Sequence, residues 1–114
     1  MEKILGLDDF QAMCLRTCPP ITSGTNMVLG LCGETGEIAD IVKKVEFHRH
    51  PLDEKTIEKI KLELGDVLWY VGMLAKHLNF TLSEVATANQ EKLMRRYPQG
   101  FSAERSINRK PEDD

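Results

Sequence analysis

Apolar residues recur at every third or fourth position through most of the chain, which is the period of an α-helix. No segment alternates apolar and polar residues for long enough to predict a β-sheet. The pattern therefore predicts an all-α protein with four helices, over about residues 8–18, 25–47, 54–78 and 82–96.

Polar residues at the predicted helix starts are suited to capping. Thr25 or Asn26 would cap the second helix and Asp53 the third, because their side-chain oxygens accept hydrogen bonds from free backbone N–H groups. The run from Thr81 to Glu84 has the spacing of a capping box and opens the fourth helix. Prolines after the first and fourth helices would end them, since proline cannot continue the hydrogen-bond ladder.

The third helix carries the clearest packing seam. Its apolar residues advance by alternating steps of four and three, as in an antiparallel four-helix bundle: Ile60, Leu64, Val67, Val71, Leu74 and Leu78. A chain of 114 residues has room for one such domain. We expect this domain at residues 1–102, and residues 103–114, which are polar and lack periodicity, to form an extended or mobile tail.

Four acidic residues stand at the edge of the predicted core. Glu34 lies within the apolar stripe of the second helix and Glu37 at its border, while Glu63 and Asp66 flank the seam of the third. Asp40 turns toward solvent and is at most a supporting residue. Two consecutive helices thus each bring an acid pair, spaced by three residues, to the same core.

Such a cluster predicts a metal site. A buried, ionised carboxylate costs several kcal/mol unless a cation compensates it. Carboxylate oxygens without thiolate or imidazole suit Mg²⁺ or Mn²⁺ better than Zn²⁺, and such ions also bind substrate phosphates. One ExxE pair alone is usually a solvated helix face, but two pairs beside apolar seams favour a site. A di-iron bundle would need ExxH pairs, and no histidine follows a glutamate by three.

The fourth helix brings the opposite charge. Asn89 lies on its apolar stripe with Lys92 and Arg96 on either flank. A buried Asn89 would need hydrogen-bond partners, and the neighbouring cations could hold phosphates. The alternative is that Arg95 and Arg96 only complement the dipole at the helix C-terminus.

Trp69 points away from the seam of the third helix, between Gly65 and Gly72 in angle. Small residues beside a large aromatic let another helix approach closely, so we expect this face to be buried against a second subunit, in a dimer or a larger homo-oligomer. Two alternatives remain at this stage. The first helix could cover Trp69 within one chain, or Trp69 or Tyr70 could stack on a base.

The composition limits which binding partners and which cell compartment we expect for the protein. The net charge of −3 gives no general basic field for nucleic acid. The longest apolar run is too short to span a membrane, and the N-terminus does not resemble a signal peptide, so we expect a cytoplasmic protein. Three cysteines without a CxxC pair predict neither a disulfide framework nor a zinc site, and we interpret them as small, mostly buried residues.

Three segments of the chain, GLCGETGEIADIVKK, KLELGDVLWYVGMLA and ANQEKLMRRYPQGFS, resemble the MazG-like branch of the all-α nucleoside triphosphate pyrophosphatases over about residues 24–102. The resemblance implies Mg²⁺-dependent hydrolysis of an NTP or dNTP, between the α and β phosphates, to the monophosphate and pyrophosphate. It assigns metal binding and catalysis to Glu34, Glu37, Glu63 and Asp66, and nucleotide binding to Asn89, Lys92, Arg96 and Tyr97. It also suggests a house-cleaning role.

Two other hypotheses stay open. Related all-α families act on dUTP, dCTP or phosphoribosyl-ATP, and the same bundle would serve them. A helical oligomer that binds metal and nucleotide without turnover is the non-enzymatic alternative. Within the enzyme hypothesis, Glu37 is our choice for the residue that takes a proton from the attacking water.

Overall fold

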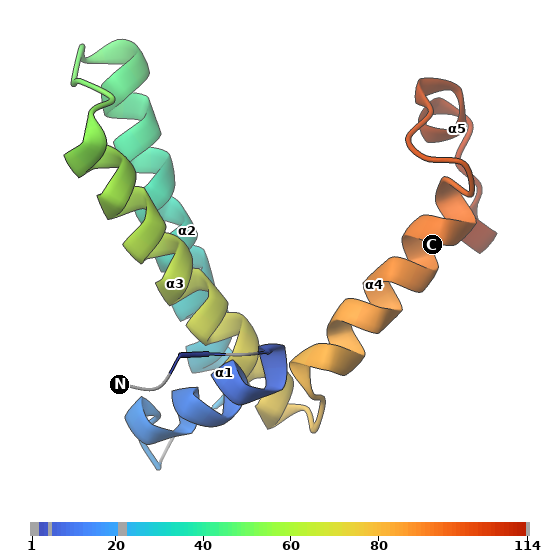
Figure 1. Cartoon of the computed structure of the whole chain (residues 1–114), viewed down its shortest axis with the longest axis horizontal. Coiled ribbons are helices and arrows are strands. Elements are labelled where there is room, and N and C mark those ends of the chain that lie inside the picture. Colours follow the sequence, from blue (N-terminus) through green and yellow to red (C-terminus); the bar gives the residue numbers. More distant parts are fainter. Residues whose placement is uncertain (1–2, 5, 21–22, 114) are drawn as a thin grey trace.

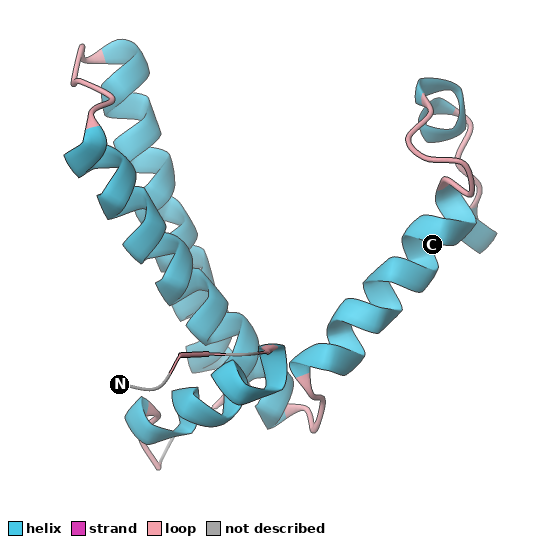
Figure 2. Cartoon of the chain, in the orientation of Figure 1, coloured by secondary structure: helices cyan, strands magenta, loops and turns pink. Residues whose placement is uncertain are grey.

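The structure, a computed structural model, describes residues 3–4, 6–20 and 23–113. Its elements in chain order are α1 (Leu7–Cys14), η1 (Leu15–Thr17), α2 (Gly24–Phe47), α3 (Glu54–His77), α4 (Leu82–Arg96), α5 (Ala103–Ile107) and η2 (Pro111–Asp113). Figure 2 shows helices and loops and no strand in this part of the chain, which confirms the all-α prediction. None of the helices in the described ranges has the length and apolarity needed to cross a membrane.

Side-chain caps fix where the long helices begin. Asp53 Oδ1 accepts a hydrogen bond from the N–H of Thr56 at 2.9 Å, and Thr81 Oγ1 accepts one from the N–H of Glu84 at 3.0 Å, as predicted. The predicted cap of α2 was wrong. Helix α2 begins one residue earlier than expected, so that the cap is Ser23, whose Oγ accepts from the N–H of Asn26 at 3.1 Å.

Helices α2 and α3 form a long antiparallel hairpin, and α1 lies across one end of it (Figure 1). The small core sits at this crossing. Cys14, Met27 and Met73 are buried there, and four larger side chains pack around them: Phe10, Trp69, Tyr70 and Leu74.

The ring of Tyr70 from α3 lies directly against α2 at Gly30. A β-carbon on this residue would overlap the ring of Tyr70. The absence of a side chain at Gly30 therefore lets the tyrosine ring lie in the seam between α2 and α3. Tyr70 also makes an edge-to-face contact with Trp69, with ring centroids 4.9 Å apart.

The corner between α3 and α4 is held by the side-chain amide of Gln11. Its Nε2 donates to the carbonyls of Gly72 and Phe80 at 3.1 and 3.0 Å, and its Oε1 accepts from the N–H of Leu82 at 3.1 Å. Gln11 is only 6% exposed, so these are buried hydrogen bonds. Asp8 adds a second bond from α1, since its Oδ1 accepts from the N–H of Ser83 at 2.9 Å.

Beyond this corner α4 runs away from the hairpin, and the two arms form a V (Figure 1). The four-helix bundle is therefore not closed within one chain. The radius of gyration is 17.3 Å, whereas a compact domain of this length would have about 13 Å. Leu64 and Leu78, both assigned to the predicted seam, are each 54% exposed.

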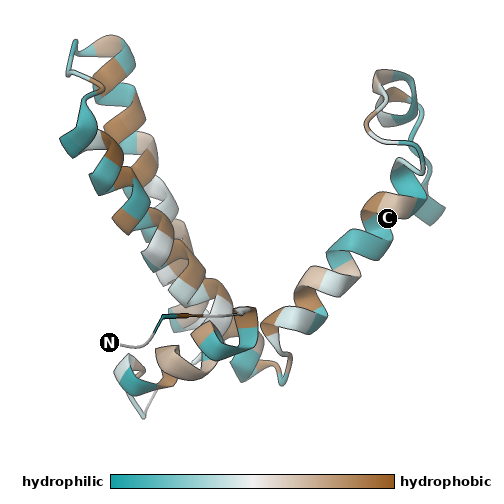
Figure 3. Cartoon of the chain, in the orientation of Figure 1, coloured by the Kyte–Doolittle hydropathy of each residue, from teal (hydrophilic) through white to brown (hydrophobic). Residues whose placement is uncertain are grey.

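Apolar side chains line one flank of the hairpin. Helical periodicity places a group of exposed aliphatic residues on the flank opposite Glu37: Val28 and Val42 of α2, and Ile57, Leu64 and Leu68 of α3. Figure 3 shows such apolar positions along the length of this arm.

Trp69 is covered inside the chain. Its indole Nε1 donates to Thr17 Oγ1 at 2.8 Å, and its ring packs against the core beside α1. Our expectation of a subunit interface at this face is thus not supported, and the alternative, in which the first helix covers Trp69, describes the structure.

The C-terminal residues fold back onto α4 in place of the extended tail that we expected. Ser102 Oγ accepts from the N–H of Arg105 at 3.2 Å and caps α5. The guanidinium of Arg105 then donates to the carbonyls of Arg96 and Arg95 at 2.6 and 3.2 Å, which satisfies the last turn of α4.

The cysteines differ in burial. Cys14 is buried, Cys18 is half-buried and Cys32 is exposed, and none of the three forms a disulfide bond. Burial raises the pKa of the Cys14 thiol because it disfavours the thiolate. The interpretation of the cysteines as buried apolar residues holds for Cys14 and fails for Cys32.

Candidate metal centre

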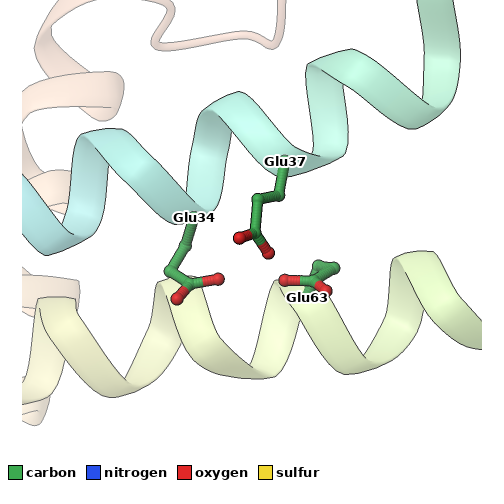
Figure 4. A group of neighbouring side chains, drawn as sticks. All are labelled: Glu34, Glu37 and Glu63. Carbon is green, nitrogen blue, oxygen red and sulfur yellow. The ribbon is translucent and has the colours of Figure 1, made fainter.

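Three carboxylates meet between the arms of the hairpin. Glu34 and Glu37 lie one turn apart on α2, and Glu63 reaches them from α3 (Figure 4). Each offers an oxygen within 4.8 Å of the others. The positions follow from the hydrophobic pattern, since Glu34 and Glu63 occupy seam positions where both helices turn inward.

Two oxygens of this cluster lack partners. Glu34 Oε2 and Glu63 Oε2 are buried and accept no hydrogen bond within the described residues. An unpaired carboxylate oxygen loses its hydration without compensation, which is costly. A cation between the carboxylates would remove this cost, and an all-oxygen donor set fits Mg²⁺ or Mn²⁺.

Glu37 is exposed at the rim of the cluster, and its pKa is raised. The main cause is a hydrogen bond with the Glu63 carboxyl group, followed by repulsion from the Glu63 charge. Without a cation, the neighbouring Glu63 carboxyl group therefore favours the protonated form of Glu37.

Asp40 is engaged differently. Its carboxylate pairs with Lys43 at 2.9 Å and with Lys44 at 2.8 Å. Hydrogen bonds from these lysines lower the pKa of Asp40 to about 2. Two lysines already balance the charge of Asp40, which agrees with the supporting role assigned to it from the sequence.

A hollow of about 470 Å³ opens beside the cluster, lined by Gly33, Gly36, Glu37, Asp40, Ile41, Lys59 and Glu63. A β-carbon on Gly33 or Gly36 would meet no atom within 4 Å, so this side of α2 is open. This lining was not predicted from the sequence. The signal was the spacing of Gly30, Gly33 and Gly36, which places glycines along one side of α2.

Asp66 stands outside the group of converging oxygens. It lies one turn beyond Glu63 on α3 and is exposed, although its charge contributes to the raised pKa of Glu37. Three of the four predicted acids therefore meet in one place, and the fourth is adjacent.

The predicted nucleotide-binding residues do not reach the acids of their own chain. Asn89, Lys92 and Arg96 lie on α4, which leads away from the hairpin (Figure 1). Asn89 is exposed, so the prediction that it is buried was wrong. Arg96 Nε donates to the carbonyl of Asp113 at 3.1 Å, and the Tyr97 ring lies 5.4 Å from that of Phe101.

A larger hollow, of about 740 Å³, lies between the end of α4 and the C-terminal turns. Among the residues that the structure describes, no group of converging acids lies in this hollow, and Arg105 in its wall already binds the carbonyls of α4. The acid cluster on the hairpin is the better candidate for chemistry.

Comparison with known proteins identifies a family for this chain. The family model of the MazG nucleotide pyrophosphohydrolase domain matches residues 22–101, which contain the whole hairpin and α4. The chain belongs to this family. Membership of the MazG family supports nucleotide pyrophosphohydrolase activity in general terms, and the converging acids lie inside the matched range.

Two curated relatives match the chain over more than two thirds of their own length. The Gene 37 protein of Mycobacterium phage L5 is 38% identical over 84 residues, which is 73% of this chain and 74% of the relative. The uncharacterized protein YvdC of Bacillus subtilis (strain 168) is 34% identical over 73 residues, or 59% of this chain and 69% of the relative. No solved structure gives a significant match.

Proposed function

We propose that the protein is a Mg²⁺-dependent nucleoside triphosphate pyrophosphohydrolase, which cleaves an NTP or dNTP between the α and β phosphates. The observation that carries this proposal is the meeting of Glu34, Glu37 and Glu63, with two buried oxygens that lack partners, in a MazG-family chain. The products would be the nucleoside monophosphate and pyrophosphate. Mn²⁺ is the alternative ion.

Glu34, Glu37 and Glu63 would hold the ion, with Asp66 on the next turn of α3 as a further ligand. A bound divalent ion would supply charge neutralisation to the phosphates and a lower pKa for an attacking water. The hollow beside Glu37, open at Gly33 and Gly36, is the entry for the triphosphate in this proposal.

Glu37 is our choice for the group that accepts a proton from the water. It is exposed at the rim of the hollow, whereas Glu34 and Glu63 each bury an oxygen. Asn89, Lys92, Arg96 and Tyr97 would bind the phosphates and the nucleoside, the two cations offsetting charge on the departing pyrophosphate.

Self-association is the second part of the proposal. The chain exposes 8889 Å², whereas a compact monomer of 12.9 kDa would expose about 6,300 Å². The excess, about 2,600 Å² per chain or about 5,200 Å² for a pair, lies at the upper end of the range for obligate homodimer interfaces. The apolar flank at Val42 and Leu64 supports burial against another copy, as a dimer or tetramer.

The test is product identification. The purified protein would be incubated with Mg²⁺ and each common NTP and dNTP, and with phosphoribosyl-ATP. Pyrophosphate plus monophosphate, lost in Glu63→Gln and retained in Asp40→Asn, supports the proposal. Orthophosphate plus diphosphate would overturn the assigned bond. Preference for dUTP, dCTP or phosphoribosyl-ATP would favour the related specific enzymes, and Mg²⁺-dependent binding without any product would favour a non-catalytic sensor.

A further inference from the structure

The contact between Gly30 and Tyr70 lies in the same seam between α2 and α3 as the acid cluster. A step of seven residues leads from Gly30 to Glu37 along α2, and an equal step leads from Tyr70 back to Glu63 along α3. Seven residues make about two helical turns, so each pair lies on one face of its helix. The register in which Tyr70 meets Gly30 is therefore the register in which Glu63 meets Glu37.

The same register continues past the acids toward the closed end of the hairpin. A further step of four residues leads to Ile41 on α2 and to Lys59 on α3, and both line the hollow beside the cluster. Helix α2 ends at Phe47 and α3 begins at Glu54, so a short connection joins the arms at that end. The acids thus lie between two constraints, the short connection on one side and the contact between Tyr70 and α2 on the other.

The Tyr70 ring is fixed on both of its sides. On one side it contacts the ring of Trp69, whose Nε1 donates to Thr17 Oγ1 at 2.8 Å. The Thr17 hydroxyl in turn donates to the carbonyl of the core residue Cys14 at 3.2 Å. On the other side the Tyr70 ring occupies the space that a β-carbon at Gly30 would need. The ring therefore sets how closely α2 and α3 approach at this level.

A metal centre built on two helices depends on such a fixed approach. Mg²⁺ requires nearly ideal octahedral geometry, with oxygen ligands at about 2.0–2.1 Å. Glu34 on α2 and Glu63 on α3 would have to supply such oxygens from opposite sides of the seam. A change in the separation of the helices would therefore move the two donors relative to each other. Residues that orient metal ligands from outside typically change metal affinity about 10–100-fold when they are replaced.

We propose that Tyr70 is a positioning residue of the metal centre. Its ring, seated against Gly30, fixes the register and the separation at which the acids of α2 face Glu63 of α3. The inference rests on the proposed function and extends it, because Tyr70 acts through the two helices and not through contact with the ion or the nucleotide.

Titration of the metal-free protein with Mn²⁺, followed by electron paramagnetic resonance and without nucleotide, tests the role of the ring. Tyr70→Leu removes the ring, and Gly30→Ala fills the space that the ring occupies. Each change should weaken Mn²⁺ binding about 10–100-fold. Tyr70→Phe keeps the ring and should bind Mn²⁺ as wild type does. Wild-type affinity in Tyr70→Leu, or an equal loss in Tyr70→Phe, would overturn the proposal.

Two control variants separate positioning from a general loss of stability. Gln11→Met removes hydrogen bonds at the corner and leaves the seam intact. Gly65→Ala makes the same change as Gly30→Ala on the same hairpin, but its β-carbon meets no atom within 4 Å. Both controls should keep the Mn²⁺ affinity of wild type. A loss in Gln11→Met as large as that in Tyr70→Leu would show that affinity only follows stability, against the proposal.

A distance measurement tests the positioning without metal or activity. Ala39 and Lys61 are exposed, and helical spacing places them on the outer sides of α2 and α3 at the level of the cluster. Spin labels on Ala39→Cys and Lys61→Cys, in a Cys18→Ser/Cys32→Ser background diluted with unlabelled chain, report the separation of the helices by pulsed electron paramagnetic resonance. Tyr70→Leu should shift or broaden the distance distribution, and Tyr70→Phe should not. An unchanged distribution in Tyr70→Leu would overturn the proposal.

The outcomes separate this inference from the proposed function. A wild type that binds Mn²⁺ and releases pyrophosphate, with Tyr70→Leu unchanged in affinity and distance, refutes the positioning alone. A wild type that binds no Mn²⁺ refutes the proposed metal site, and the distance measurement then decides whether Tyr70 sets the separation of the helices. A Tyr70→Leu protein that keeps its Mn²⁺ affinity and loses only nucleotide affinity would assign the ring to stacking on the base, which contradicts the proposal.

Discussion

The carboxyl groups of Glu37 and Glu63 face each other across the hairpin, and this contact raises the pKa of Glu37. A hydrogen bond between them is the larger cause and charge repulsion the smaller. In the absence of metal, protonation of Glu37 is therefore favoured at the place where the proposed ion would bind. Protons and the ion compete for the same oxygens.

The raised pKa of Glu37 predicts how the metal-free protein responds to pH. The folded-state pKa exceeds the ordinary value of 4.5, so the stabilisation from protonated Glu37 is present below that pH and is lost as the pH rises through the folded-state pKa. Asp40, whose pKa is about 2, does not titrate in this range. Thermal unfolding in chelator should show wild type losing stability relative to Glu37→Gln from pH 4.5 toward neutrality. A pH-independent difference would contradict this.

Metal should stabilise the folded protein through the acid cluster. An ion at 100 times its dissociation constant adds about 2.7 kcal/mol to the free energy of unfolding. We expect Mg²⁺ to raise the melting temperature of wild type and of Asp40→Asn, because Asp40 is paired with lysines. Glu63→Gln should lose most of this rise, since it removes a ligand. Equal stabilisation of Glu63→Gln would count against the site.

Replacing either of two glycines of α2 by alanine should change the stability of the fold, and the two changes should have opposite signs. Gly30→Ala forces the Tyr70 ring out of the seam and should destabilise the fold by about 1–3 kcal/mol through overpacking. Gly33→Ala meets open space and should stabilise α2 by about 0.5–1 kcal/mol. Urea unfolding of both variants measures the difference, and similar effects at the two positions would show that the approach at Gly30 is not close.

Gln11 should be the most sensitive polar residue of the corner. Gln11→Met keeps the shape of the side chain but leaves the N–H of Leu82 and two carbonyls without their partner. One buried polar group left without a hydrogen bond should lower the free energy of unfolding by about 1–3 kcal/mol. Gln90→Met, on the exposed surface of α4, should stay within about 0.5 kcal/mol of wild type. Urea titrations compare the two, and an equally small effect at Gln11 would show that the corner does not depend on it.

The helices and two of the acids were predictable because local signals determine them. Asp53 and Thr81 mark helix starts through bonds to residues three positions away, and the apolar period alone turns Glu34 and Glu63 inward. The spacing also put Asp66 beside the seam, but a helical wheel does not tell how far an exposed carboxylate lies from its neighbours.

The direction of α4 could not be predicted. It depends on Gln11, whose side chain forms hydrogen bonds with backbone groups 61 to 71 positions away in the sequence. In a helical pattern this residue looks like an ordinary surface glutamine. The same crossing of α1 covers Trp69. With α4 turned away, Asn89 is exposed, although its position on the apolar stripe suggested burial. The fold of the C-terminal residues depends likewise on contacts between Arg105 and the end of α4.

The most direct test of the account is a titration of the metal-free protein with Mn²⁺, followed by electron paramagnetic resonance and without nucleotide. Wild type and Asp40→Asn should remove Mn²⁺ from solution saturably, and Glu34→Gln/Glu63→Gln, folded by circular dichroism, should not. Wild type that takes up no Mn²⁺, or the double variant binding it as well as wild type does, would contradict the claim that these carboxylates converge to hold a divalent ion.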